Sequence, residues 1–141
     1  DAYCGVGLFA LSCSDNFASV TGIEISEAAI QLAKANADIL NIDNVCFQSG
    51  KAEAIFNHIT YPGDATSVVI DPPRKGCDLS FIEQLIAFKP RKIIYVSCDP
   101  ATQARDLKYF VEKSYKLLEL QPFDLFPHTR HIENIAILEC V

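Results

Sequence analysis

The sequence has few basic residues. It contains 12 lysines and arginines against 18 aspartates and glutamates, which gives a formal net charge of −6. Because phosphate contacts supply much of the affinity of nucleic-acid-binding proteins, this balance counts against a nucleic-acid surface on these residues alone. A nucleic-acid partner would require basic surface from another part of the protein.

Long hydrophobic runs are also absent. No apolar stretch reaches the roughly 20 residues needed to cross a bilayer, and no signal-peptide pattern opens the chain. Half of the residues are nevertheless hydrophobic and 21% are charged, as in globular proteins. We therefore expect no membrane partner and an intracellular, reducing location, with the cytoplasm favoured over the nucleus and the mitochondrion.

Paired cysteine motifs are missing as well. The six cysteines stand at positions 4, 13, 46, 77, 98 and 140, and none forms a C-x-x-C pair. A chain of 141 residues can build a real core and is not a small secreted scaffold. We therefore expect reduced thiols, with neither a disulfide framework nor a bound metal.

Helical and extended patterns alternate along most of the chain. The predicted strands are 20–25, 45–48, 67–70 and 92–97. The predicted helices are 6–14, 27–41, 51–58, 79–88 and 100–113. The strand 67–70 is nearly continuously apolar, which is typical of a parallel sheet covered on both faces. This alternation predicts an α/β fold with an open, doubly wound, mostly parallel, Rossmann-like sheet.

The two ends of the chain differ from this pattern. Near the end, two strands at 117–120 and 135–138 are joined by a loop too short for a crossover helix, which predicts an antiparallel pair at the sheet edge. The first residues, 1–5, are typical of a strand end entering a glycine turn. We therefore expect a truncated first strand and a single domain, residues 1–141, cut from a longer protein.

A glycine loop opens the sequence. Residues 1–10, DAYCGVGLFA, place Gly5 and Gly7 between a strand end and a helix, where glycine permits a tight turn and close approach of a ligand. Glu24 follows Gly7 by 17 residues at the end of the next strand, where a carboxylate can accept ribose hydroxyls. The loop therefore predicts a nucleoside-cofactor site. Ala10 completes a G-x-G-x-x-A pattern, so NAD is an alternative.

A second motif, IDPPRKG, follows the strand at 67–70. Asp71 stands directly after this strand, at the end that faces the ligand crevice of an open sheet. Pro72 and Pro73 restrict the backbone and remove two donors, which predicts a rigid turn. A nicotinamide site does not require this arrangement.

A cysteine stands at the tip of the strand at 92–97. Cys98 is followed by Asp99, a good N-cap, and by Pro100, a good first helical residue. The helix dipole favours a thiolate there, whereas the charge of Asp99 opposes it. We interpret the other five cysteines as structural. Glu133, before the last strand, is a candidate partner carboxylate.

Together these segments resemble one family. DAYCGVGLF, GIEIS, IDPPRKG, VSCDPATQARD and PHTRHIE, in this order, are similar to the RNA 5-methyluridine methyltransferases. These enzymes use S-adenosylmethionine to make ribothymidine in tRNA or rRNA. The resemblance covers essentially the whole chain and implies the C-terminal catalytic domain of a larger protein, with a class I methyltransferase fold.

The resemblance also implies roles for particular residues. Cys98 matches the nucleophile and Glu133 the base. The positions that match cofactor contacts are Tyr3, Gly5, Gly7, Glu24 and Asp71. The implied substrate is RNA, with tRNA favoured over rRNA, and an accessory RNA-binding domain is expected upstream.

Several positions depart from the family pattern. The chain has Asp99 where the family usually has asparagine, and Gln103 where it often has leucine. Lys51 stands where many methyltransferases place an acid or asparagine near the adenine. We expect neither Asp99 nor Gln103 to touch a reacting group.

Three alternatives stay open. The first is another S-adenosylmethionine-dependent methyltransferase, acting on cytosine carbon 5 or on an exocyclic amine; amine methylation needs no cysteine. The second is a non-catalytic RNA-binding domain that keeps the fold. An NAD-dependent oxidoreductase comes last.

Overall fold

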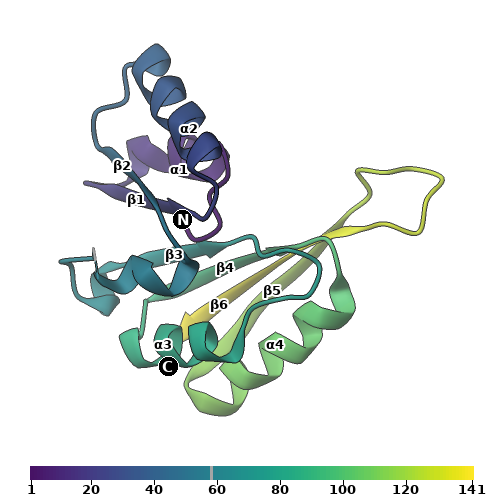
Figure 1. Cartoon of the computed structure of the whole chain (residues 1–141). Helices are drawn as coiled ribbons and strands as arrows, with labels where there is room; N and C mark the ends of the chain where they lie inside the picture. The colour runs from purple at the N-terminus through teal and green to yellow at the C-terminus, as the bar shows by residue number, and fades with distance from the viewer. Residues whose placement is uncertain (58) are drawn as a thin grey trace. The chain divides into compact units, whose positions relative to one another are not determined.

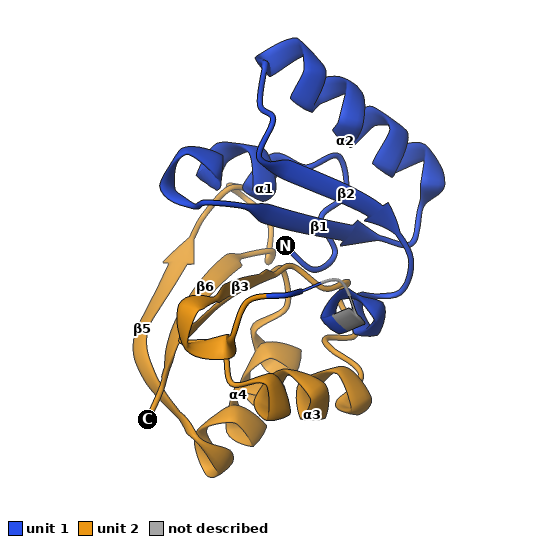
Figure 2. Ribbon diagram, turned by 90° about the vertical axis from the view of Figure 1, so that its left-hand side faces the viewer, with its two compact units in different colours: residues 1–60 blue, residues 61–141 orange. Residues whose placement is uncertain are grey.

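The computed structural model describes residues 1–57 and 59–141. The chain forms two compact units, residues 1–60 and residues 61–141, and each is described by itself (Figure 2). The helices of the described residues are too short or too polar to span a bilayer.

The first unit is a two-stranded parallel sheet with two α-helices. Its main elements are α1 (Leu8–Cys13), β1 (Val20–Glu24), α2 (Glu27–Leu40) and β2 (Val45–Ser49), with 3₁₀ helices η1 (Ser14–Asn16) and η2 (Ala52–Asn57). Strands β1 and β2 pair in parallel from Val20 opposite Val45 to Glu24 opposite Ser49. Both helices lie on the same side of this sheet (Figure 2).

Helix α2 forms where the sequence predicts it. The side chain of Ser26 caps its start by accepting a hydrogen bond from the Ala29 N–H at 3.3 Å. Ile30, Ala33 and Ala37 are buried along one face, and the helix ends at Asn41 in the left-handed conformation.

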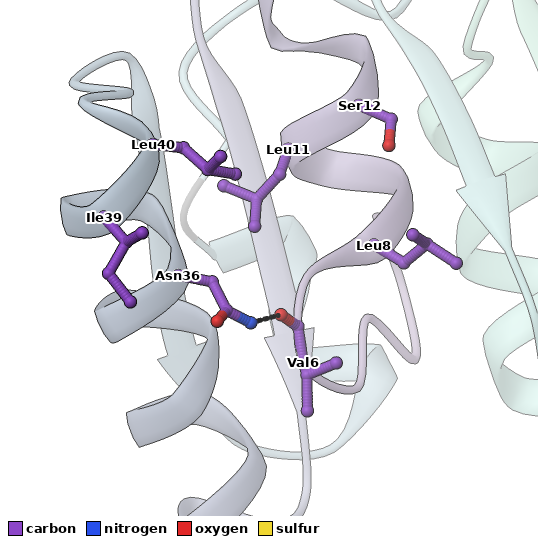
Figure 3. A pocket seen from close by; sticks show the side chains of 7 residues that line it. All are labelled: Val6, Leu8, Leu11, Ser12, Asn36, Ile39 and Leu40. Atoms are coloured by element: carbon purple, nitrogen blue, oxygen red, sulfur yellow. Dashed lines mark hydrogen bonds between the residues drawn. The ribbon is translucent and has the colours of Figure 1, made fainter.

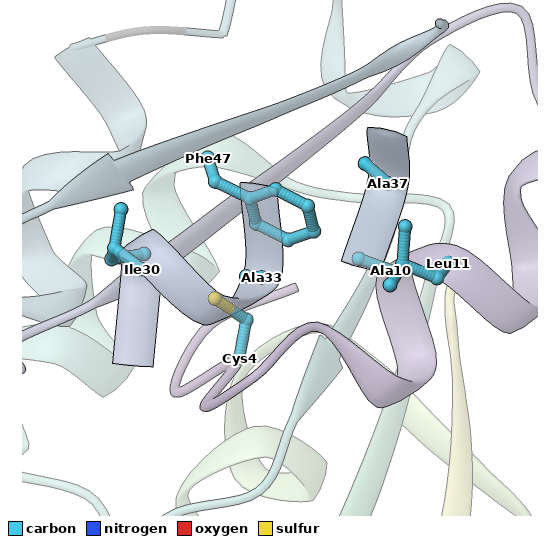
Figure 4. Close-up of a cluster of buried hydrophobic side chains, with 7 residues drawn as sticks. All are labelled: Cys4, Ala10, Leu11, Ile30, Ala33, Ala37 and Phe47. Carbon is cyan, nitrogen blue, oxygen red and sulfur yellow. The ribbon is translucent and has the colours of Figure 1, made fainter. Parts of the chain in front are cut away.

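A cluster of buried side chains joins the two helices to the sheet. Its members are Cys4, Ala10, Leu11, Ile30, Ala33, Ala37 and Phe47 (Figure 4). Burial raises the pKa of the Cys4 thiol to about 11, so this thiol stays protonated at neutral pH. Cys4 is therefore a small hydrophobic residue of the core.

The second unit contains a four-stranded sheet. Its elements are η3 (Gly63–Ala65), β3 (Ser67–Ile70), α3 (Leu79–Phe88), β4 (Lys92–Ser97), α4 (Pro100–Lys113), β5 (Tyr115–Phe123) and β6 (Glu133–Cys140). The strand order is β3-β4-β6-β5, and α3 and α4 cover the same face of the sheet (Figure 1). The last strand in sequence is thus an inner strand.

The pairing within this sheet is mixed. Strands β3 and β4 are parallel, whereas β6 runs antiparallel to both β4 and β5. The predicted α/β class and the predicted antiparallel final pair are confirmed. Both final strands are longer than predicted, because β6 forms hydrogen bonds with a neighbour on each side.

One predicted helix differs in the structure. The sequence predicts a helix over 51–58, but the described residues there form the 3₁₀ helix Ala52–Asn57, and position 58 lies outside the described residues. Runs of 3₁₀ helix are short because their hydrogen-bond geometry is poorer than that of an α-helix.

Candidate active site

The glycine loop of the first unit has an unusual backbone. Tyr3, Gly5 and Gly7 all have positive φ angles, of 68°, 53° and 90°. A β-carbon at Gly7 would lie 2.7 Å from Cζ of Phe47, whereas one at Gly5 would have no heavy atom within 4 Å. Gly7 is therefore required by packing as well as by conformation, while Gly5 leaves open space above the loop.

The Asp1 carboxylate binds the main chain of helix α1, directly after the glycine loop. Gly7 occupies the N-cap of α1 and has no side chain to cap it. The Asp1 carboxylate accepts a hydrogen bond from the Ala10 N–H at 2.9 Å and thereby supplies this cap from a distance. Sequence reasoning missed this role, although an acid at the start of a glycine loop is a signal for it.

Glu24 lies at the end of β1, beside the loop. Its Oε2 accepts a hydrogen bond from the Gly5 N–H at 3.3 Å and its Oε1 from the Ser26 N–H at 3.0 Å. The side chain is only partly buried, and each carboxylate oxygen keeps capacity to accept a further hydrogen bond. The structure therefore brings the predicted residues Tyr3, Gly5, Gly7 and Glu24 together.

The second unit carries the other three predicted residues. Asp71 directly follows β3, Cys98 directly follows β4, and Glu133 is the first residue of β6. The antiparallel register of β4 and β6 ends with Ser97 opposite Asn134. One further step in this register places Cys98 opposite Glu133, although 35 residues separate them in sequence.

Asp71 shares this edge of the sheet. In the parallel register Ile70 lies opposite Tyr95, so Asp71 is one position beyond the paired region. Burial, with a smaller contribution from the negative charge of Glu133, raises the pKa of Asp71 to about 6. The two carboxyl groups therefore interact, and all three predicted residues are only partly buried.

The turn that carries Cys98 is fixed on both sides. The Ser97 hydroxyl accepts a hydrogen bond from the Asp99 N–H at 3.1 Å and donates one to the Asp99 carbonyl at 3.0 Å. The Asp99 carboxylate accepts from the N–H groups of Ala101 at 2.9 Å and Thr102 at 3.2 Å. The predicted N-cap is confirmed, and Cys98 is held between a strand end and a helix start.

A buried carboxylate fastens the turn that follows Asp71. Asp106 is fully buried and accepts hydrogen bonds from the Tyr95 hydroxyl at 2.7 Å and the Cys77 N–H at 2.8 Å. Arg105 contacts the same carboxylate at 2.6 Å and donates to the Lys75 carbonyl at 3.0 Å. Helix α4 thus holds residues 75–77 through two consecutive side chains. The sequence analysis assigned no role to Arg105 and Asp106, although these residues are the final R-D of the motif VSCDPATQARD.

Gly76 allows this contact. Its φ is 79°, and a β-carbon would lie 2.6 Å from both the Arg105 and the Asp106 side chains. Burial raises the pKa of Tyr95 far above its usual value, so its hydroxyl remains a donor to Asp106. The turn is therefore a packed, hydrogen-bonded structure.

Further contacts join this turn to its neighbours. The Thr102 hydroxyl donates to the Arg74 carbonyl at 3.0 Å, and the Arg74 guanidinium lies 3.4 Å from Nδ1 of His131. His128 and Arg130 are exposed. The segment before β6 is therefore linked to the turn after β3 through Arg74.

A surface pocket of about 350 Å³ lies between α1 and α2 (Figure 3). It is lined by Val6, Leu8, Leu11, Ser12, Asn36, Ile39 and Leu40. The Asn36 amide donates to the Val6 carbonyl at 3.1 Å across it. None of the predicted cofactor residues lines this pocket, although Val6 of the glycine loop does.

The cysteines and acids of the described residues form no group suited to a metal. None of the six cysteines takes part in a disulfide, and no cluster of three or more His, Cys, Asp or Glu side chains that could hold a metal occurs in the part of the chain that the structure describes.

Solved structures define the class of the fold. An rRNA methylase from Streptococcus thermophilus superposes with a TM-score of 0.79 at 14% identity, covering 100% of this chain and 84% of that one. At this identity the likeness concerns the fold alone. Together with the 35% identical methyltransferase structure described below, it shows the fold of the class I S-adenosylmethionine-dependent methyltransferases, as predicted.

Sequence comparison defines the family. The family model described as tRNA (Uracil-5-)-methyltransferase matches residues 1–141. The tRNA (uracil(54)-C(5))-methyltransferase of Schizosaccharomyces pombe is 48% identical over 142 residues, which cover 98% of this chain and 27% of that protein. The same enzyme of Saccharomyces cerevisiae is 43% identical over 144 residues, covering 99% and 22%. The chain belongs to the tRNA (uracil-5-)-methyltransferase family.

A solved relative agrees with this assignment. The tRNA (uracil-54, C5)-methyltransferase of Pyrococcus abyssi, crystallised with S-adenosyl-L-homocysteine, has a TM-score of 0.82 and 35% identity. The match covers 98% of this chain and 33% of that one. The chain thus spans about a fifth to a third of the length of these relatives.

Proposed function

We propose that the chain is the catalytic part of an enzyme that methylates carbon 5 of a uridine in RNA, with tRNA favoured over rRNA. S-adenosylmethionine is the proposed methyl donor. One observation carries the proposal: the register of β4 and β6 ends beside Cys98 and Glu133. Opposed residues of an antiparallel pair have Cβ atoms about 4.5–5.5 Å apart. A thiol and a carboxylate so placed can act on one substrate ring.

The first proposed step is addition of the Cys98 thiolate to carbon 6 of uracil. Carbon 5 is too weak a nucleophile to take a methyl group directly. A new S–C6 bond shifts the electrons of the C5–C6 double bond and makes carbon 5 enolate-like. Carbon 5 would then take the methyl group that bound S-adenosylmethionine would supply, with the S–CH3 bond breaking and S-adenosylhomocysteine leaving as a neutral thioether.

The second proposed step restores the uracil ring. Glu133 removes the proton from carbon 5, the electrons of that C–H bond re-form the C5–C6 double bond, and the C6–S bond breaks. The Cys98 thiolate is released and Glu133 holds the proton. Asp71, beside Glu133 and with a raised pKa, is proposed to face the cofactor and the target base.

The glycine loop fits the nucleoside part of the cofactor. Gly5 has open space where its side chain would be, and the Glu24 carboxylate beside it can accept two ribose hydroxyls. Backbone hydrogen bonds from Gly5 and Ser26 hold this carboxylate in place. Tyr3 and Gly7 shape the same loop.

The experiment uses the full-length protein with Glu133→Gln. Incubated with S-adenosylmethionine and total tRNA, it is expected to accumulate a protein–RNA adduct, seen on a denaturing gel and by intact mass. Adding Cys98→Ala should abolish the adduct. The control, Cys46→Ala at an exposed cysteine of the first unit, should keep it.

Other outcomes separate the alternatives. If Glu133→Gln formed no adduct while the parent still methylated tRNA, the thiolate mechanism would be excluded and amine methylation favoured. Labelled product identified as 5-methylcytidine would point to cytosine. If a double variant of Cys98 and Glu133 kept both RNA binding and function, a non-catalytic RNA-binding domain would be favoured.

A further inference from the structure

Gln103 is a polar side chain in the interior of the second unit. It lies one turn into α4 and is 1% exposed. Its Nε2 donates hydrogen bonds to the Tyr95 carbonyl at 2.9 Å and to the Asn134 carbonyl at 3.2 Å. Its Oε1 accepts from Nδ2 of Asn134. Both N–H donors and the oxygen of the amide therefore have partners within the protein.

These partners lie on the two strands that carry the proposed chemistry. Tyr95 belongs to β4, which ends one residue before Cys98. Asn134 directly follows Glu133 in β6 and is itself buried. Two of the three hydrogen bonds go to Asn134, one to its main chain and one to its side chain. Gln103 thus joins the helix that begins after the thiol to the strand that begins with the carboxylate.

The proposed reacting groups, the Cys98 thiol and the Glu133 carboxylate, lie on segments that are held by different contacts. The Cys98 turn has its own hydrogen bonds from Ser97 and Asp99, which do not involve the Gln103 side chain; only the Gln103 N–H contributes, to the Asp99 carbonyl at 3.1 Å. Glu133 lies at the first position of its strand and pairs with Phe123 of β5, whereas on the side of β4 the pairing stops at Asn134 opposite Ser97. On that side, Gln103 is the side chain that joins the start of β6 to β4 and α4.

We propose that Gln103 is a positioning residue for Glu133. Through Asn134 it fixes the first residues of β6 against β4 and α4, and it thereby sets the Glu133 carboxylate at the distance from the substrate that proton removal requires. The proposal rests on the function proposed above. Proton transfer requires hydrogen-bond reach, so a small displacement slows it strongly.

The test measures two rate constants in the full-length protein. Under single turnover with tRNA and S-adenosylmethionine, rapid quenching and denaturing gels follow the formation and the decay of the protein–RNA adduct. In Gln103→Leu we expect the decay to slow at least tenfold and the formation to change less than twofold. The Michaelis constant for the cofactor should not change.

A second variant protects the test against misfolding. Gln103→Leu leaves the Asn134 amide buried without its partner, which destabilises the fold. The double variant Gln103→Leu/Asn134→Leu removes both polar side chains, so its stability should recover, but its positioning contact stays lost. We expect it to melt closer to the parent and still to accumulate adduct.

Matched controls separate the possible failures. Gln84→Leu makes the same change at an exposed glutamine of α3 and should behave as the parent. Glu133→Gln, run beside it, reports on the function itself; if it forms no adduct, the proposed function fails and the positioning role with it. If it does form adduct, equal slowing of both steps in the folded double variant, or unchanged decay, would overturn the role of Gln103.

Discussion

The two units hold their candidate site residues by different means. In the first unit the loop is shaped by the main chain: three positive φ angles and hydrogen bonds from backbone N–H groups to Asp1 and Glu24. In the second unit the strand ends are held by buried side chains, Gln103 and Asp106, that reach across elements. A site built from main chain tolerates side-chain changes that leave φ unaltered, whereas a site built on buried polar groups is sensitive to each of them.

The largest expected effect lies in the second unit, at Asp106. Asp106→Leu leaves the Tyr95 hydroxyl and the Cys77 N–H buried without their acceptor. At about 1–3 kcal/mol for each unsatisfied group, we expect the free energy of unfolding to fall by roughly 3 kcal/mol. Urea denaturation of the full-length protein measures this. Asp106→Asn, which keeps an acceptor, should lose less; equal losses would contradict the hydrogen-bond argument.

Two glycines of the first unit should respond differently to the same change. Gly7→Ala combines a φ of 90° with a close approach to Phe47, whereas Gly5→Ala meets only the conformational penalty. The left-handed conformation costs about 1–2 kcal/mol for a residue with a β-carbon, and the clash adds to it at Gly7. Thermal melts should rank Gly7→Ala below Gly5→Ala. Gly5→Ala should instead show its main effect on cofactor affinity, by calorimetric titration.

The N-cap of α4 should have a smaller effect. Asp99→Ala removes the acceptor for the Ala101 and Thr102 N–H groups and is expected to cost about 1 kcal/mol. Asp99→Asn keeps a capping oxygen and should cost less. Denaturant midpoints of the two variants compare them directly. A loss in Asp99→Asn as large as in Asp99→Ala would mean that charge, and not capping, is what matters at this position.

The smallest expected effect is a shift in titration. Asp71 should titrate at about pH 6, and Glu133→Gln should lower this pKa only partway toward 3.8, because burial is the larger cause. Since folding raises this carboxyl pKa, its contribution to stability is present below about pH 3.8 and lost as pH rises through about 6. Carbon-13 NMR of the side-chain carboxyls measures the pKa. A value near 3.8 in the parent would contradict the described burial.

Local signals explain why much of the fold was predictable. Strands 67–70 and 92–97 and helices 79–88 and 100–113 have the predicted bounds. Each is set off by turn residues or by a cap, such as Asp99 and Pro100, whose effect is confined to a few neighbouring positions. β5 extends beyond its predicted bounds because its pairing with β6 sets its length, and the prediction missed its ends because its residues are mostly exposed and show no hydrophobic alternation.

The expectation that Gln103 touches no reacting group holds only for direct contact. Its side chain reaches Asn134, the neighbour of Glu133, 31 residues further along the chain. A single glutamine in an amphipathic helix carries no signal of such a partner. Likewise, the final R-D of VSCDPATQARD marks Asp106 as part of a motif, but it does not indicate that the carboxylate accepts hydrogen bonds from Tyr95 and Cys77.

The sequence by itself determined which chemical groups stand at the strand ends. Asp71 and Cys98 follow apolar runs, and Glu133 precedes one; these placements depend on neighbours in the chain. Only the tertiary structure decided that β6 lies between β4 and β5 and that its register stops at Ser97 and Asn134. Register is set by hydrogen bonds between strands distant in sequence, and a slip of one residue would turn every side chain to the other face. The placement of Cys98 and Glu133 one position beyond the last pair therefore comes from the fold.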